Sequence, residues 1–111
     1  ASSTNRIVVK ENGKIKIIPL VQVQYLEAAD DYIKIHAADG VFLKKKTMQF
    51  FEDNLSAQEF IRIHRSYIIN VQMITRVDLM EKETYSVLLT NGIRLPVSKS
   101  GYAKLKEVLG I

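Results

Sequence analysis

The sequence predicts one mostly β domain, built from short antiparallel strands with one or two short helices. Its 111 residues are enough for one hydrophobic core and too few for two ordinary ones. Apolar residues alternate or cluster over four to six positions with turn residues between them, which is the pattern of strands. Two Asn-Gly pairs, at 12–13 and 91–92, can adopt the positive φ angles of tight hairpin turns.

The amino-terminal part of the chain predicts strands joined by short turns. Five segments have the strand pattern, namely 7–10, 15–18, 24–27, 32–37 and 41–43. The residues between them are turn formers, namely Asn12-Gly13, the polar corner 28–31 and Asp39-Gly40. Within the fourth segment, Ile33 and Ile35 alternate with polar residues, so we expect both on the buried face.

A short helix is expected in the middle of the chain. Met48, Phe51 and Leu55 fall at positions i, i+3 and i+7 of a stretch rich in helix formers. Thr47 stands just before them and can serve as the N-cap. The sequence therefore predicts a helix over about 47–55.

The carboxy-terminal half returns to the strand pattern and ends in a second helix. The expected strands are 60–64, 66–70, 74–79 and 85–89. Across the second Asn-Gly turn, two sets of apolar residues should share one buried hairpin face, namely Tyr85, Val87 and Leu89 with Ile93, Leu95 and Val97. A helix over about 99–109 follows, with Ser98 as its N-cap. We assign residues 7–111 to the domain and the small polar residues 1–6 to the remnant of a linker.

Composition and motifs argue against several classes of protein. Hydrophobic residues make up 47% and charged residues 25%, which is the balance of a globular domain. No run of about 18 apolar residues could cross a bilayer, and the absence of cysteine excludes disulfides and thiolate chemistry and fits the cytoplasm. His36 and His64 lie on different expected strands without metal-ligand spacing, and no nucleophile or phosphate-loop motif is present. We therefore expect no enzyme, no metal and no cofactor.

Basic residues are more informative because of where they stand. The net charge is +4 and the sequence pI about 9.4, a modest excess that suits an anionic partner. Cations accompany hydroxyls in three segments at strand ends or helix starts, namely 44–47, 62–67 and 98–100. Each has a simpler interpretation, because a lysine run is often a solvated face and Ser98 can be a helix cap alone. The alternative function is a small β-rich protein-interaction or ligand-sensing module.

Three motifs give the chain a resemblance to a known family. The segment Phe60-Ile61-Arg62-Ile63-His64-Arg65-Ser66-Tyr67-Ile68-Ile69-Asn70 resembles the hallmark of the LytTR family of bacterial DNA-binding domains. Segments 25–36 and 95–99 agree with it, and the likeness runs from about Ile7 to Leu109. The resemblance implies a LytTR-like fold of short antiparallel sheets that binds DNA through loops. It also implies the output domain of a two-component response regulator, preceded by an amino-terminal receiver domain in a phosphorelay.

The family's DNA-contacting positions can be carried over to this sequence. They imply base contacts from Arg65, Lys99, Asp31 and Tyr32. We assign phosphate contacts to the basic and hydroxyl residues around them, namely His64, Ser66, Ser98, Ser100, Lys44, Lys45 and Lys46. The expected function is sequence-specific binding of double-stranded DNA, with loops in the major groove of tandem direct repeats and a second copy on the adjacent repeat.

Overall fold

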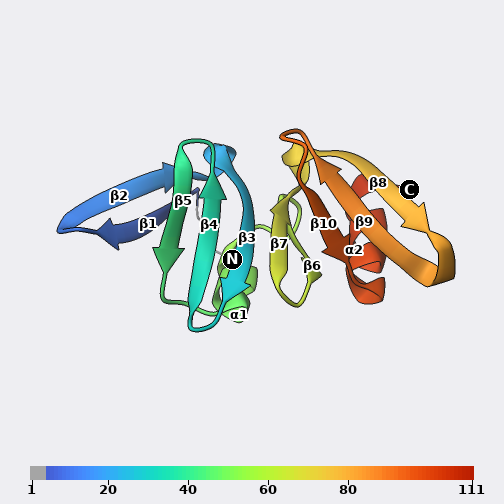
Figure 1. Ribbon diagram of the computed structural model, residues 1–111, viewed down its shortest axis with the longest axis horizontal. Helices are drawn as coiled ribbons and strands as arrows, with labels where there is room; N and C mark the ends of the chain where they lie inside the picture. Colours follow the sequence, from blue (N-terminus) through green and yellow to red (C-terminus); the bar gives the residue numbers. More distant parts are fainter. Residues whose placement is uncertain (1–4) are drawn as a thin grey trace.

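The computed structural model describes residues 5–111, which form three antiparallel sheets side by side along a molecule of 47 × 30 × 24 Å (Figure 1). The strands of the described residues are β1 (Arg6–Glu11), β2 (Lys14–Pro19), β3 (Val23–Ala29), β4 (Tyr32–Ala37), β5 (Gly40–Lys44), β6 (Phe60–His64), β7 (Tyr67–Asn70), β8 (Ile74–Met80), β9 (Thr84–Leu89) and β10 (Arg94–Val97). The helices are α1 (Met48–Asn54) and α2 (Lys99–Leu109), with single 3-10 turns at Leu20–Gln22, Val71–Met73 and Glu81–Glu83. The predicted fold class is confirmed.

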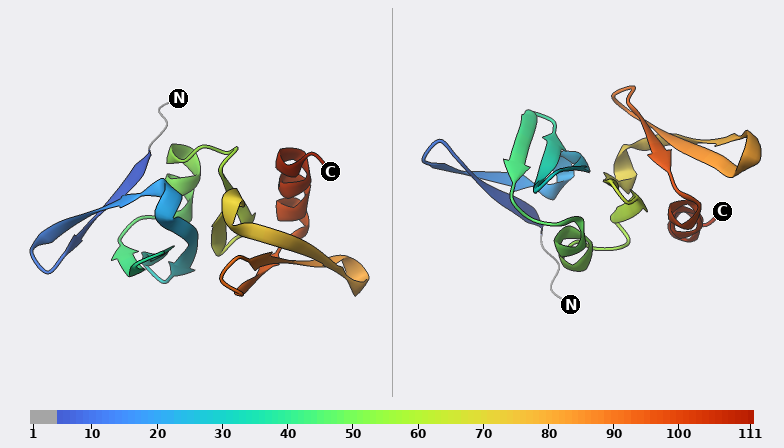
Figure 2. Two further views of the ribbon diagram at one scale, coloured as in Figure 1. Left: turned by 90° about the horizontal axis from the view of Figure 1, so that it is seen from above. Right: turned by 60° about the horizontal axis from the view of Figure 1, so that its bottom comes forward.

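Sheet order explains how distant parts of the chain meet. A two-stranded sheet holds β1 and β2, a five-stranded sheet has the order β5-β4-β3-β7-β6, and a three-stranded sheet has the order β10-β9-β8. The hairpin β6–β7 therefore enters the central sheet beside β3 and forms its edge. Figure 2 shows this hairpin between α1 and α2, which lie on the same side of the strands.

The first Asn-Gly turn forms as the sequence predicts, whereas the second is longer, and of its Asn91-Gly92 pair only Gly92 takes a positive φ, 88°. Asn12 and Gly13 adopt φ values of 49° and 76° between β1 and β2, as the Asn-Gly turn requires. The polar corner is tighter than expected, because Ala29 already pairs with Tyr32 and only Asp30 and Asp31 form the turn. Asp30 takes φ 55°, a left-handed conformation that aspartate tolerates better than most residues. The first four residues of the predicted linker lie outside the described part of the chain, and Arg6 begins β1.

The apolar residues form two buried clusters rather than the single core that the chain length led us to expect. The first lies between β1–β2, one face of the central sheet and α1, and includes Ile18, Leu26 and Ile35. The second lies between the three-stranded sheet, the β6–β7 hairpin and α2, and includes Ile63 and Leu105. The division arises because β6 and β7 bury both faces: Phe60 and Ile68 belong to the first cluster, and Ile61 and Ile69 to the second.

The caps predicted for both helices are present. Thr47 Oγ1 accepts a hydrogen bond of 3.0 Å from the Phe50 amide, and Ser98 Oγ accepts one of 3.0 Å from the Gly101 amide. The expected buried hairpin face also forms, except for Ile93, which is 37% exposed. That part of the prediction was wrong because the turn is longer than two residues. The Asn91 side chain accepts from the Ile93 amide and holds this residue in the loop.

Candidate nucleic-acid interface

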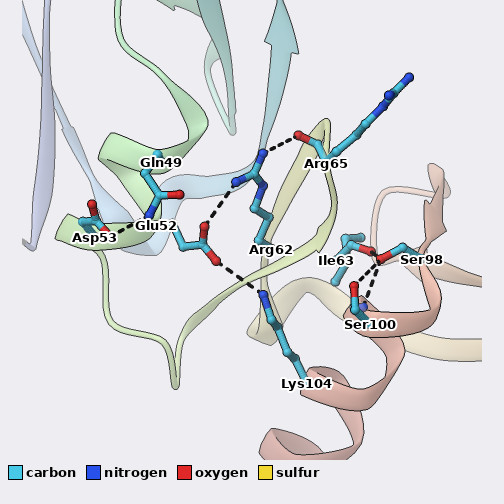
Figure 3. A network of polar contacts seen from close by, with 10 residues as sticks. Gln49, Glu52, Asp53, Arg62, Ile63, Arg65, Ser98, Ser100 and Lys104 are labelled. Atoms are coloured by element: carbon cyan, nitrogen blue, oxygen red, sulfur yellow. Dashed lines mark hydrogen bonds and ion pairs between the residues drawn. The ribbon is translucent and has the colours of Figure 1, made fainter.

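The β6–β7 turn is held from three sides. The Ser66 amide donates to His64 Nδ1 at 3.1 Å, and the Ala28 amide donates to the Ser66 carbonyl at 2.9 Å. Arg62 Nη2 donates to the Arg65 carbonyl at 2.9 Å. These contacts fix the backbone of the turn while the exposed Arg65 side chain extends away from it, as Figure 3 shows. A guanidinium presented in this way can donate two parallel hydrogen bonds to a partner.

The ring of His64 has a defined hydrogen-bonding role. Because Nδ1 accepts the Ser66 amide, a neutral ring carries its proton on Nε2. That nitrogen can donate to an anionic oxygen. The ring centroid lies 5.8 Å from that of Tyr67, which supports the imidazole from one side.

A bulge in β6 brings the start of α2 against this turn. The β6–β7 register shifts between Arg62 and His64, so Ile63 is left out of the strand pairing. Its carbonyl accepts instead from the Ser98 amide at 2.7 Å and from Ser98 Oγ at 3.2 Å. The approach needs a glycine in the first turn of α2, because a Cβ on Gly101 would stand 2.1 Å from the Ile63 oxygen.

Residues from the turn and from α2 line one cavity of about 400 Å³, namely Glu52, Arg62, His64, Arg65, Ser98, Ser100 and Lys104. Lys99 lies between two of these lining residues, exposed at the first position of α2. Arg65 and the 98–100 segment are therefore brought together on one side of the molecule. The cavity is lined by three cationic side chains and one carboxylate.

A second hollow of about 640 Å³ adjoins the first one at Arg62, which lines both. It is lined by the β3–β4 turn and by the segment before α1, including Asp31, Lys45 and Lys46. Tyr32 follows the turn at the start of β4 and is 43% exposed. The structure thus brings the first corner and two of the three lysines next to the β6–β7 turn.

Lys44 is the one predicted site residue that lies elsewhere. Its Nζ donates to the Val8 carbonyl, and it lines a separate cavity of about 210 Å³ with Phe50 and Phe51 among its walls. Burial lowers the pKa of this ammonium, and the positive charge of Lys46 lowers it further. Lys44 is the last residue of β5, whereas Lys45 and Lys46 follow the strand and line the other hollow.

Sequence reasoning missed a network of charged side chains behind the β6–β7 turn. Glu52 of α1 lies 3.2 Å from Arg62 Nη1 and 3.4 Å from Lys104 Nζ, so that it joins β6 to α2 (Figure 3). A signal existed for two of these residues, because Glu52 stands on the polar face of the predicted helix and Arg62 belongs to the hallmark segment. Their meeting depends on tertiary structure, which the sequence pattern does not encode.

Two further polar clusters lie outside these hollows. On the central sheet, His36 Nε2 lies 2.9 Å from Glu27 Oε1, and the Tyr25 ring stacks on His36 at 4.1 Å. Burial, then the charge of Glu27 and a hydrogen bond with it, raise the pKa of Tyr67.

The other cluster lies on the three-stranded sheet, where Arg76 and Arg94 donate to Asp78 and lower the pKa of its carboxyl. Both arginines are thus committed to an ion pair. Among the side chains that the structure describes, no three or more of His, Asp or Glu gather as a group that could hold a metal ion. No helix in this part of the chain has the length and apolar character needed to cross a membrane.

Known proteins similar to this chain agree with the motifs. The model of the LytTr DNA-binding domain family matches residues 13–110. Sensory transduction protein LytT of Bacillus subtilis (strain 168) is 24% identical over 107 residues, which are 96% of this chain and 44% of that protein. Transcriptional regulatory protein LytR of Staphylococcus aureus is 36% identical over 77 residues, which are 69% of this chain and 31% of that protein. The chain thus spans less than half the length of these relatives.

A solved structure is similar over nearly the whole chain. It is a LytTr DNA-binding domain from Bacillus cereus, 31% identical, with a TM-score of 0.87 over 98% of this chain and 100% of that one. A chain whose sequence is 31% identical thus has the same overall fold. Together, the family match and this structural likeness support a function in DNA binding and transcription regulation. The chain belongs to the LytTR family of DNA-binding domains.

Proposed function

We propose that this domain binds double-stranded DNA in a sequence-specific manner and serves as the output domain of a bacterial response regulator. The observation that carries the proposal is the convergence of three segments on adjoining hollows, the 45–47 segment, the β6–β7 turn and the start of α2. They combine cations with hydroxyls, which is the chemistry that recognises a phosphate backbone. The exposed Arg65 adds a group suited to base edges.

Base reading is assigned to the side chains that extend beyond the turns. Arg65 donates two hydrogen bonds to O6 and N7 of a guanine in the major groove, and Lys99 donates to a second base with less geometric constraint. Asp31 and Tyr32 extend from the first corner. In this proposal Asp31 accepts from a cytosine amino group, since its charge repels phosphates.

Phosphate contacts are assigned to the residues around Arg65 and Lys99. His64 donates from Nε2, and the hydroxyls of Ser66 and Ser100 donate beside it. The Ser98 hydroxyl can donate to a phosphate only if it leaves the Ile63 carbonyl. Lys45 and Lys46 supply charge at the adjoining hollow. Lys44 contributes directly only if it leaves the Val8 carbonyl, so the main phosphate contacts of this run fall to its two neighbours.

The proposal also covers the full-length response regulator. The relatives are named for sensory transduction and transcriptional regulation, and the Bacillus cereus structure is described as part of a response regulator. We infer an amino-terminal receiver domain phosphorylated by a sensor kinase, and binding of two copies to tandem direct repeats. Because the bacterial chromosome lies in the cytoplasm, this function implies a cytoplasmic protein.

The experiment is a selection of bound sites from random duplexes, followed by sequencing. The selected duplex and a shuffled duplex of equal composition are then titrated at several salt concentrations. We expect an enriched motif occurring as a direct repeat, and binding to the selected duplex about 10³-fold tighter than to the shuffled one. Equal affinity for both duplexes at every salt concentration would contradict the proposal and favour a protein-interaction or ligand-sensing module.

A further inference from the structure

One carboxylate joins the three elements that adjoin the segments assigned to DNA binding, α1, β6 and α2. Glu52 lies in α1, directly after the lysine segment, and its two oxygens contact Arg62 of β6 at 3.2 Å and Lys104 of α2 at 3.4 Å (Figure 3). The Glu52 and Arg62 side chains are partly buried, with 32% and 25% of their surface exposed, whereas Lys104 is 51% exposed. The pair between Glu52 and Arg62 is therefore the more protected part of the network.

The orientation of the Arg62 guanidinium depends on this carboxylate. One terminal nitrogen contacts Glu52 and the other donates to the Arg65 carbonyl at 2.9 Å. Within the described residues, the third nitrogen, Nε, is buried without a hydrogen-bond partner. A neutral side chain at position 52 would leave this half-buried cation without its counter-charge, and its Nε has no acceptor among the described residues to hold it in place, which favours its turning toward water. Arg62 would then release the Arg65 backbone.

We propose that Glu52 and Arg62 are positioning residues for base recognition by Arg65, acting through the carbonyl that Arg62 holds. The inference rests on the proposed function, because it requires Arg65 to read a base. Two parallel hydrogen bonds to guanine require that the backbone of Arg65 be held in a fixed position. A mobile turn would therefore reduce discrimination between bases more than it reduces the overall affinity for DNA. Glu52 thus affects specificity although it carries the charge that phosphates repel.

Removing the Glu52 carboxylate should affect the selected duplex and random DNA differently, which distinguishes a positioning role from general support of the fold. A carboxylate beside the interface weakens binding to every duplex, so its removal should leave random DNA bound equally well or more tightly. The same removal should weaken the selected duplex by loosening Arg65. A residue that only supports the fold would weaken both.

The test compares Glu52→Gln with Asp53→Asn, which removes the same charge from the next residue of the same helix. Asp53 is exposed and accepts a hydrogen bond from Gln49, outside the network. For E52Q we expect the ratio of affinities for selected and shuffled DNA to fall by about fivefold, whereas D53N should keep it within about twofold. The loss in E52Q should be confined to the base pair whose discrimination Arg65→Ala removes.

Arg62→Lys gives an independent variant, because lysine keeps the charge but cannot bridge Glu52 and the Arg65 carbonyl in the same planar geometry. It should reproduce the loss, and the double variant E52Q/R65A should lose no more discrimination than R65A alone. Urea denaturation of each variant reports folding.

Several outcomes would overturn the inference: an unchanged ratio in E52Q, equal weakening on both duplexes, additive losses in the double variant, or an E52Q protein that no longer folds. If R65A loses discrimination while E52Q does not, the inference fails and the proposed function stands. If the unaltered chain shows no preference between duplexes, the proposed function itself fails.

Discussion

Gly101→Ala tests the contact that seats α2 against the β6 bulge. Helix propensity alone predicts that this substitution raises the unfolding free energy, because alanine is a better helix former than glycine by about 1 kcal/mol. The tertiary contact predicts that it lowers the unfolding free energy. The added Cβ, however, would lie 2.1 Å from the Ile63 oxygen and 2.6 Å from its carbonyl carbon, both of them backbone atoms. Since ordinary contact begins near 3.4 Å, the first turn of α2 has to move by about 1.3 Å.

That displacement lengthens the hydrogen bond between the Ser98 amide and the Ile63 carbonyl, now 2.7 Å, beyond any useful range. Overpacking lowers the unfolding free energy by about 1–3 kcal/mol and the lost hydrogen bond lowers it by about 1 kcal/mol. The better helix propensity of alanine raises it by about 1 kcal/mol. We expect a net loss of about 2 kcal/mol of unfolding free energy. Lys99 would also move relative to Arg65, so affinity for the selected duplex should fall by about tenfold or more.

Urea denaturation followed by circular dichroism measures the first effect, and titration with selected and shuffled duplexes measures the second. Ala103→Gly is the matched control in an exposed position of the same helix, where propensity alone should cost about 1 kcal/mol. A G101A protein that is as stable as the unaltered chain, or more stable, would refute the reasoning from close backbone contact.

Four further predictions address the interface and the core. Arg65→Ala should lose about 1–3 kcal/mol of discrimination at one guanine in titrations with single-base variants, and equal weakening on random DNA would count against base reading. Replacing Lys45 and Lys46 by alanine should weaken binding to all sequences and lower the slope of log affinity against log salt by about 0.9 per lost contact; an unchanged slope would remove them from the interface. Leu95→Ala, at a buried position, should cost about 2–5 kcal/mol, so an unshifted urea midpoint would be inconsistent with its packing. Two arginines hold the pKa of Asp78 below its ordinary value, so its stabilising effect is present above that value and lost as pH falls below it. Asp78→Asn should therefore flatten the decline of the urea midpoint on the acid side, and an unaltered decline would argue against the ion pairs.

Local chemistry explains why much of the fold could be predicted. Asn12-Gly13 specifies a two-residue turn because both residues reach positive φ, and Thr47 and Ser98 cap helices through hydrogen bonds within three residues. These interactions involve neighbours in the sequence. The sequence therefore contains what is needed to place the strands and helices to within one or two residues.

Some features of the fold depend on tertiary contacts that sequence patterns do not show. Strand periodicity does not show that β6 and β7 bury both faces, so the second cluster of buried residues was not expected. Three consecutive lysines look equivalent in sequence, yet Lys44 contacts the Val8 carbonyl while its neighbours line another hollow. Ile93 continues an apolar alternation, yet it lies in the loop, where its amide donates to Asn91 and its carbonyl accepts from the Leu89 amide.

The candidate site also contains residues that the sequence predicts and residues whose role depends on tertiary contacts. The hallmark segment predicts Arg65 and His64, because basic residues in an apolar stretch are out of place in a core. The polar helix face predicts that Glu52 is exposed but not which residues it contacts, and Gly101 has no sequence signal, since a glycine near a cap is common. Their importance comes from contacts with residues 10 and 38 positions away in the sequence, at Arg62 and Ile63.

The central claim is that the β6–β7 turn, the start of α2 and the 45–47 segment form one DNA-binding face. Backbone amide chemical shifts, recorded by NMR during titration with the selected duplex, test it most directly. We expect the largest changes in residues 64–66, 98–101 and 45–47, with small ones on β1–β2 and on the outer face of β8–β10. Largest changes on those two regions, together with unperturbed amides in 64–66 and 98–101, would contradict a DNA-binding face at this position.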